Sequence, residues 1–269
     1  MFRKNFKILL GILIIGGVFT SCEYEKLLKS SNYKRKYDKA LEYYHDEDYS
    51  KAIGLFEQIN PSLKATNKAD TVHFYLAKAY YETKDYILAK NYFQEFYRTF
   101  GDHSWAEDAQ FLSAYCDYLL SPRPSLDQSN TREAINGFQM FIRRYPGSDK
   151  VQESRELIED LQNKLAEKSY IAARLYYDME DYKAAIIALN NSLKDYPESP
   201  YREEIRFLIL KSKFLLASNS VKQKEEERFQ SALDEYYTFI DQYPDSEYQK
   251  EVEKIYEVTQ EKLNNKSGT

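Results

Sequence analysis

The sequence predicts an all-α protein, built as a solenoid of about five helical hairpins with one long helix joining the third hairpin to the fourth. Three of the eight glycines lie within residues 1–21, and the seven prolines are predicted to stand between segments of helical periodicity. Proline confined to junctions, with little glycine elsewhere, is typical of helical chains. No stretch alternates apolar and polar residues over the length of a strand. The second observation behind the prediction is an internal repeat.

A shared ending marks four segments of the chain. The tetrapeptides YPGS, YPES and YPDS begin at Tyr145, Tyr196 and Tyr243, and an alanine precedes each tyrosine by eleven positions. The same interval leads from Ala89 to Phe100. A fixed interval of this kind indicates stacked copies of one supersecondary unit.

Further positions recur upstream of these alanines. Tyrosine pairs begin nine residues before an alanine at Tyr43, Tyr80 and Tyr176, and another small residue lies twelve residues before the same alanine. This spacing predicts a helix, a tight turn and a second helix, whose axes approach closely where small residues face each other. A larger side chain at such a contact would overpack it, at a cost of about 1–3 kcal/mol.

These positions resemble the tetratricopeptide (TPR) consensus over roughly residues 33 to 258. The small residues, the second-helix aromatics and the terminal prolines of the consensus are matched, with Leu189 at one aromatic position. The resemblance implies that the small residues and prolines pack the repeats together. These packing residues are Ala40, Ala52, Ala77, Ala89, Ala134, Ala173, Ala185, Ala232, Pro146, Pro197 and Pro244.

Places where the chain departs from the repeat predict an inserted loop, a stretched connection and one long helix. The stretch SPRPSLDQSN at 121–130 is expected to be a loop inserted between the helices of unit 3, and KQKEEER at 222–228 to be a stretched connection in unit 5. From Ser148, a good helix N-cap, to Asp178 the helical pattern has no breaker. This predicts one helix of about 30 residues.

The N-terminus has the layout of a secretory signal. Three basic residues within positions 3–7 precede an apolar or glycine stretch at 8–19, an order typical of such signals. The stretch is shorter than the ~20 apolar residues that a spanning helix needs. The tetrapeptide FTSC at 19–22 resembles the lipobox of bacterial lipoproteins, although phenylalanine replaces the usual leucine.

The lipobox resemblance implies that Cys22 carries a diacylglyceryl group, that cleavage precedes it and that the new amine is acylated. More than one buried acyl chain gives stable anchoring. Glutamate rather than aspartate follows at Glu23, which favours the outer membrane over retention in the inner membrane. An ordinary signal peptide that ends beside a cysteine is the alternative.

These features divide the chain into five expected segments. They are a signal peptide at 1–21, a lipid-anchored tether at 22–32, TPR units 1–3 at 33–146, TPR units 4–5 at 147–260 and a flexible tail at 261–269.

Charge and cysteine content narrow the possible partners. Without residues 1–21 the formal charge falls from −5 to −8, so no basic surplus favours nucleic acid or an anionic bilayer. Membrane residence is then expected to come from the lipid. With Cys22 acylated, Cys116 has no disulfide partner. Its apolar context, FLSAYCDYLL, predicts a buried core residue rather than a nucleophile.

The sequence has no pattern typical of an enzyme, a cofactor site or a metal site. Its three histidines lie in different repeat contexts, without HExxH spacing, and there is no GxSxG motif and no glycine loop before a helix. The acidic run at 225–227 is typical of a solvated helix face. We therefore expect a binding protein.

The middle of the chain resembles the BamD family, the lipoproteins of the outer-membrane β-barrel assembly machinery. The resemblance rests on the unit 3 insertion, on AINGFQMFIRRYPGSDKVQES at 134–154, on NKLAEKSYIAARLYYDMEDYKAAI at 163–186 and on LKDYPES at 193–199. It implies a periplasmic scaffold without a cofactor. The C-terminal units would dock on soluble domains of the barrel-forming assembly protein, and the N-terminal units would receive the C-terminal β-signal of unfolded outer-membrane proteins.

Four tyrosines are the predicted peptide-binding residues: Tyr43, Tyr44, Tyr80 and Tyr81. Neighbouring helical positions lie about 100° apart, so one tyrosine of a pair can pack while the other faces outward. An outward tyrosine offers apolar area and a hydrogen-bonding tip. The alternative is that the pairs serve packing alone, because one member of each matches the TPR packing tyrosine.

Two other functions are open from the sequence alone. A periplasmic TPR coordinator of cell-envelope and cell-wall machinery would share the signal and the repeat endings, although such proteins usually begin with a coiled coil and need no lipid. An outer-membrane glycan-binding lipoprotein would use exposed aromatic platforms, but is usually much larger than this chain.

Replacing Cys22 with alanine is expected to move the protein from the membrane to the soluble fraction, because alanine has no thiol to acylate. Fractionation of cell envelopes followed by immunoblotting measures the change. A Thr20→Ala variant, which keeps the cysteine and a small residue before it, serves as the control. Unchanged membrane association of Cys22→Ala would contradict lipid attachment at this residue.

Overall fold

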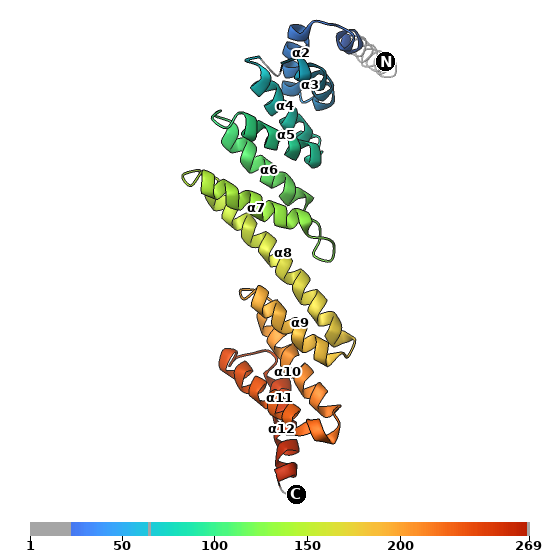
Figure 1. The fold of residues 1–269 in the computed structure, drawn as a ribbon, viewed down its shortest axis with the longest axis vertical. Helices are drawn as coiled ribbons and strands as arrows, with labels where there is room; N and C mark the ends of the chain where they lie inside the picture. Colours follow the sequence, from blue (N-terminus) through green and yellow to red (C-terminus); the bar gives the residue numbers. More distant parts are fainter. Residues whose placement is uncertain (1–22, 64–65, 268–269) are drawn as a thin grey trace, which may run out of the picture. The chain divides into compact units, whose positions relative to one another are not determined.

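The computed structural model describes residues 23–63 and 66–267, in which every regular element is a helix (Figure 1). This confirms the predicted all-α class. The expected signal at 1–21 and Cys22 lie outside the described residues. The helices are α2 (Tyr33–His45), α3 (Tyr49–Leu63), α4 (Ala69–Glu82), α5 (Tyr86–Thr99), α6 (Ala106–Leu120), α7 (Ser129–Arg144), α8 (Val151–Asp178), α9 (Tyr182–Asp195), α10 (Arg202–Ser218), α11 (Lys222–Gln242) and α12 (Gln249–Ser267).

The chain forms two compact units, each with its own core. The first takes the described residues up to Ser121 together with Ser129–Ile158. The second takes Pro122–Gln128 and the described residues from Glu159 onward. The division falls inside α8, whereas the expected segments met at 146–147, in the turn before that helix.

The small residues of the repeat are buried where helices pack together. All eight alanines predicted to pack have at most 2% of their surface exposed. Ala40 and Ala52 lie in the core of the first unit, and Ala173 and Ala185 lie in the core of the second. Helix α2 packs on α3, α4 on α5, α6 on α7 and α10 on α11. These contacts confirm the predicted helical hairpins of units 1, 2, 3 and 5.

Three hairpin turns use the same backbone conformation. One residue in each has a positive φ, of 61°, 63° or 61°: Glu47, Lys84 and Glu180. This left-handed region reverses the chain tightly and is uncommon for residues other than glycine. In all three turns the next residue is an aspartate that caps the second helix; Asp48 Oδ1 accepts from the Lys51 N–H at 3.4 Å. Asp85 Oδ1 accepts from the Leu88 N–H at 3.2 Å, and Asp181 Oδ1 accepts from the Ala184 N–H at 3.1 Å.

The Tyr-Pro-x-Ser endings also form one recurring turn. In each, the serine Oγ accepts a hydrogen bond from the backbone N–H two residues later, at 3.1 Å from Lys150, 3.2 Å from Tyr201 and 3.0 Å from Tyr248. The prolines of these turns were predicted to pack between repeats. Instead they are exposed, two residues after a helix ends, where a proline prevents the helix from continuing. They are Pro146, Pro197 and Pro244.

Two segments of unit 3 differ from their predicted bounds. Helix α8 begins at Val151, three residues after Ser148, which was predicted to be its N-cap. Ser148 accepts from the Lys150 N–H and donates to Glu107 Oε1, so its side chain holds the preceding turn rather than a helix N-terminus. The inserted connection is shorter than 121–130, because α7 already begins at Ser129.

Three further segments are more helical than predicted. The run at 222–228, expected to be a stretched connection, begins α11, since lysine, glutamate and arginine are strong helix formers. Pro61 lies in the last turn of α3 rather than at a junction. Proline has no N–H to donate to the carbonyl four residues earlier, so α3 has one helix hydrogen bond fewer in this turn. The expected tail at 261–269 carries α12 as far as Ser267.

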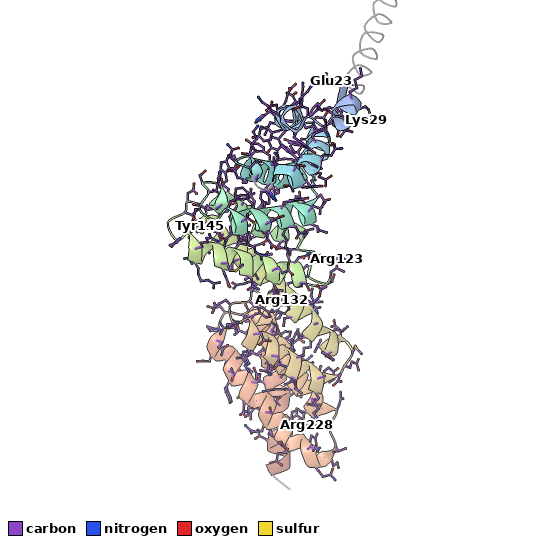
Figure 2. The ribbon with its side chains drawn as sticks, turned by 45° about the horizontal axis from the view of Figure 1, so that its top comes forward. Glu23, Lys29, Arg123, Arg132, Tyr145 and Arg228 are labelled. Atoms are coloured by element: carbon purple, nitrogen blue, oxygen red, sulfur yellow. The ribbon has the colours of Figure 1, made fainter. Side chains whose placement is uncertain are left out.

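The segment that follows Cys22 is folded rather than extended. Residues 23–28, part of the expected tether at 22–32, are helical. Figure 2 labels Glu23 at the start of this segment and Lys29 just after it. Leu27 is only 4% exposed and belongs to the core of the first unit. The segment is therefore part of that unit.

Tyr24 is seated on Gly54 of α3. A Cβ atom added at Gly54 would clash with the Tyr24 hydroxyl, so the missing side chain makes the space that this hydroxyl occupies. The segment is also held at its other end, where Lys36 Nζ donates to the Leu28 carbonyl at 3.0 Å. These contacts fix the segment on the first repeat.

Replacing Gly137 with valine is expected to destabilise the first unit by about 1–3 kcal/mol, because the added atoms would overpack the contact between α6 and α7. A Cβ atom at Gly137 would lie 2.8 Å from the Cβ and 3.3 Å from the Cα of Ala114. A Cβ atom added at Gly147 would have no atom within 4 Å. The control variant Gly147→Val is therefore expected to change the free energy of unfolding by no more than about 0.5 kcal/mol. Urea unfolding followed by circular dichroism measures both. Equal midpoints for the two variants would contradict the close approach.

Candidate functional site

Tyr80 is a core residue. Its side chain is 7% exposed, and its ring stacks on Tyr92 with the centroids 5.5 Å apart and the planes at 7°. Its hydroxyl donates to Glu57 Oε1. The prediction that Tyr80 lines a binding surface is therefore corrected, because its surface is already covered by the protein itself.

Tyr43 and Tyr81, also predicted to bind peptide, are half-buried against the same core. Tyr43 meets Tyr24 edge-on, with the ring centroids 5.8 Å apart, and Lys51 Nζ lies 5.2 Å from the Tyr43 centroid. Tyr81 meets Tyr86 edge-on at 5.7 Å. Each tyrosine ring packs against the core on one side and is exposed on the other. Neither side chain points fully into solvent.

Tyr44 belongs to a line of aromatic rings on the first helices of successive repeats. It meets Tyr75 of α4 edge-on at 4.8 Å, and Tyr75 meets Trp105, directly before α6, at 5.8 Å. Trp105 in turn stacks on Phe74 at 4.7 Å. We term Tyr44, Tyr75 and Trp105 the aromatic row. All three are half-buried, so the row keeps part of each ring at the surface.

Sequence reasoning missed two members of the aromatic row. Tyr75 lies outside the tyrosine pairs, five residues before Tyr80, and Trp105 lies in an irregular stretch before a helix. The available signal was Trp105 itself, the only tryptophan of the chain, because tryptophan is enriched in binding surfaces.

Burial keeps the tyrosine hydroxyls of this region protonated. Desolvation raises the pKa of Tyr44. It also raises the pKa of Tyr80, to which the hydrogen bond with Glu57 contributes further, and it raises the pKa of Tyr81 to about 12. Since an unperturbed tyrosine already ionises only near pH 10, these groups are neutral hydrogen-bond donors at physiological pH. The hydroxyls of Tyr44 and Tyr81, unlike that of Tyr80, which already donates to Glu57, therefore suit contact with a peptide backbone.

The second unit carries an exposed apolar stripe. Ile171 and Leu175 of α8 and Met179, directly after it, follow at intervals of four and so share one helix face. Their exposed fractions are 45%, 56% and 66%. Tyr176 beside them is 44% exposed. Large apolar groups gathered on one face in this way mark surfaces that bind other proteins.

Cys116 is fully buried, as the sequence predicted, and burial raises the pKa of its thiol to about 12. Such a thiol carries almost no thiolate at neutral pH and is a poor nucleophile. Within residues 23–63 and 66–267, no three or more histidine, cysteine, aspartate or glutamate side chains are grouped so that they could hold a metal ion.

Among the helices of the described part of the chain, none has the length and apolar content needed to cross a membrane.

Comparison with known proteins matches one family model, YfiO, described as "Outer membrane lipoprotein", to residues 29–224 and 175–267. The putative outer membrane protein assembly factor BamD of Aquifex aeolicus (strain VF5) is 27% identical over 255 residues, which cover 94% of this chain and 81% of the relative. The outer membrane protein assembly factor BamD of Buchnera aphidicola subsp. Acyrthosiphon pisum (strain APS) is 21% identical over 218 residues, which cover 74% of this chain and 89% of the relative.

A solved structure, the TPR2AB-domain:pHSP90 complex of yeast Sti1, covers 86% of this chain and 99% of its own at 13% identity. Its TM-score of 0.38 is too low to support a functional argument.

Proposed function

Because this chain belongs to the YfiO family of outer membrane lipoproteins, we propose that it is a lipid-anchored scaffold of the machinery that assembles β-barrel proteins in the outer membrane. The family assignment confirms the resemblance drawn from residues 134–199 and associates the protein with the outer membrane. The relatives named as outer membrane protein assembly factors support a general role in that assembly. The scaffold role requires neither a cofactor nor catalysis.

The proposed anchor is an acyl group on Cys22, at the periplasmic face of the membrane. Residues 23–28 begin directly after this cysteine and are packed on the first repeat. The lipid would therefore hold the first unit close to the bilayer.

The second unit is the proposed docking site for soluble domains of the barrel-forming assembly protein. The apolar stripe supports this assignment, because covering the roughly half-exposed surface of each of its side chains is worth about 0.7–2 kcal/mol per side chain. Three such side chains on one face, Ile171, Leu175 and Met179, are enough to anchor a complex once the partner covers them.

The first unit is the proposed receptor for unfolded outer-membrane proteins. An unpaired barrel strand exposes backbone N–H and C=O groups and alternate aromatic side chains, and these must be kept from aggregating. The aromatic row offers ring faces and edges for the side chains, and its tyrosine hydroxyls suit the backbone. Tyr43 and Tyr81 remain in the proposal as partly exposed tyrosines of the same unit, and Tyr80 leaves it.

The other two functions lose support. A cell-wall coordinator and a glycan-binding lipoprotein share features with the sequence, but the matched family model extends across both units of this chain.

Substituting the apolar stripe is expected to release the barrel-forming partner. The double variant Ile171→Ser/Leu175→Asp removes the apolar surface, so recovery of the partner in mild-detergent extracts should fall at least about tenfold. Quantitative mass spectrometry of the co-purified proteins measures the change. Val221→Asp, at another exposed apolar residue of the second unit, should retain the partner. Equal recovery with both variants would refute the docking site, and absence of a large barrel protein from the native extract would refute the function.

Substituting the aromatic row is expected to weaken binding of client peptides without affecting the barrel partner. For Tyr44→Ala, the affinity for a fluorescent peptide from the C-terminal strand of an outer-membrane barrel protein should fall at least about fivefold. Fluorescence anisotropy measures it. Tyr33, which is 47% exposed and lies outside the row, provides the control variant Tyr33→Ala. Normal binding by Tyr44→Ala would contradict the assignment.

A further inference from the structure

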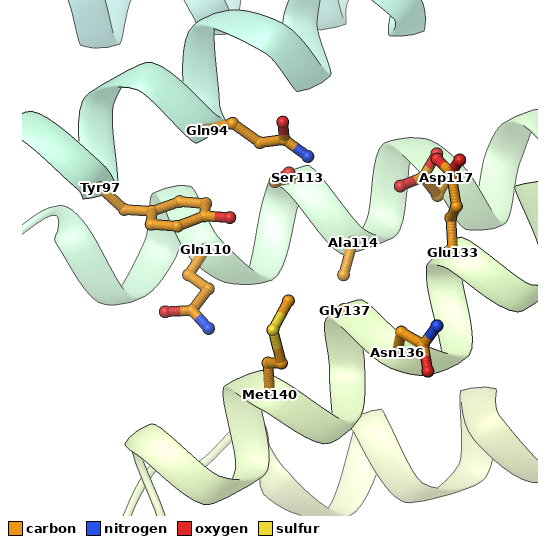
Figure 3. A pocket seen from close by; sticks show the side chains of 10 residues that line it. All are labelled: Gln94, Tyr97, Gln110, Ser113, Ala114, Asp117, Glu133, Asn136, Gly137 and Met140. Carbon is orange, nitrogen blue, oxygen red and sulfur yellow. The ribbon is translucent and has the colours of Figure 1, made fainter.

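A groove on the first unit lies between α5, α6 and α7 and uses none of the residues of the aromatic row. It consists of two adjoining depressions of about 200 Å³ and 410 Å³, which share Tyr97, Gln110 and Met140. Figure 3 shows these three side chains together at one end of the smaller depression, with Glu133 and Asn136 at its other end.

Three arginines line the larger depression, and no carboxylate does: Arg98, Arg143 and Arg144. Other arginines of the chain are neutralised, as in the pairs Arg174–Glu204 and Arg206–Glu235. Arg98 and Arg143 pair with no carboxylate among the described residues, and Arg144 donates only to the Gly101 carbonyl, at 3.4 Å. In a chain with a net charge of −5, this depression is a local concentration of unneutralised positive charge.

Helix ends account for part of this arrangement. Each arginine lies in the last turn of α5 or α7, where the helix dipole favours a positive charge. The dipole does not require that charges from two helices line the same depression, nor that the depression lack a counter-charge. Both features are those of a site for carboxylates, which guanidinium groups bind with two parallel hydrogen bonds.

The floor of the groove contains an unsatisfied acceptor. Gln110 is only 6% exposed, and its buried Oε1 accepts no hydrogen bond from the described residues. Buried polar atoms nearly always have a partner, so this amide can accept a ligand N–H once its oxygen turns towards the groove. Beside it, Met140 of α7 is 44% exposed. An apolar side chain can pack there, because methionine adapts its shape to its neighbours.

The opposite end of the groove has the opposite charge and sets a direction. Asp117 and Glu133 line it and share one cation, Lys90, whose Nζ lies 2.7 Å from Asp117 Oδ1. Two carboxylates against one ammonium leave that end negative. A bound acidic group is therefore repelled from it and drawn towards Arg98 and Arg143.

We propose that this groove binds an extended segment of a partner protein in which carboxylate side chains flank an apolar residue. The carboxylates pair with Arg98 and Arg143, the apolar side chain packs between Tyr97 and Met140, and a backbone N–H reaches Gln110. The proposal does not depend on the assembly function, since it uses different residues and a ligand of different chemistry from a barrel strand.

The test uses the full-length lipidated protein in detergent and a labelled, N-acetylated and C-amidated peptide, Ser-Asp-Leu-Glu-Glu-Leu-Ser. Amidation removes the terminal carboxylate, so that only side-chain carboxylates remain. Fluorescence anisotropy is expected to show binding that weakens as salt increases. The double variant Arg98→Gln/Arg143→Gln should bind at least about tenfold more weakly, and Met140→Ala should also weaken binding.

Two controls separate the groove from general charge attraction. Arg132 of α7 and Arg155 of α8 are exposed and belong to the same unit but line neither depression. Arg132→Gln/Arg155→Gln therefore removes the same charge and should leave binding unchanged. The peptide Ser-Asn-Leu-Gln-Gln-Leu-Ser should not bind measurably.

Several results would overturn the proposal. They are equal losses for the two double variants, equal binding of the amide peptide, no binding of the acidic peptide, and displacement of the peptide by phosphatidylglycerol added in mixed detergent micelles. The last would show a site for anionic headgroups rather than for a peptide.

Discussion

The close approach of paired helices at alanine is the constraint on which the rest of this structure depends. Helices whose axes approach this closely bury Ala52 and Ala89 completely, and each hairpin then presents a surface that only another hairpin can cover. The stacking is consequently repeated along each unit. The tyrosines, the aromatic row and the groove between α5, α6 and α7 all take their positions from this spacing, since each is built from side chains on different helices.

The repeated architecture could be predicted from the sequence because steric requirements recur at fixed intervals. Only small residues fit the positions of Ala134 or Ala185, so the repeat interval is visible in the sequence itself. Helix ends follow weaker preferences and were predicted less well. A lysine- and glutamate-rich run such as 222–228 has the same composition on a helix as in a solvated connection, and only the contacts of α11 decide between them. Likewise Ser148 suits a helix cap and an irregular turn equally, and its hydrogen bonds favour the turn.

The candidate sites were harder to predict, because a binding surface depends on which way a side chain faces. Tyr80 and Tyr81 are adjacent, and the pattern alone does not fix how the helix is rotated about its axis. In the fold both pack, Tyr80 most deeply. The aromatic row joins Tyr44, Tyr75 and Trp105 across three repeats; its members are distant in sequence and do not occupy one position of the repeat consensus. The arginine-lined groove is likewise visible only once α5 and α7 are placed beside α6.

The seating of Tyr24 on Gly54 has a consequence for how far this protein can reach. A flexible tether lets an anchored domain explore a volume that grows with linker length. The effective concentration of the domain near a neighbouring partner falls as that volume grows. Here only two peptide bonds separate Cys22 from Tyr24, a span of at most about 7 Å. If the cysteine carries the lipid, the first repeat has almost no slack, and its encounters with other membrane-bound proteins become a two-dimensional search at a fixed height above the bilayer.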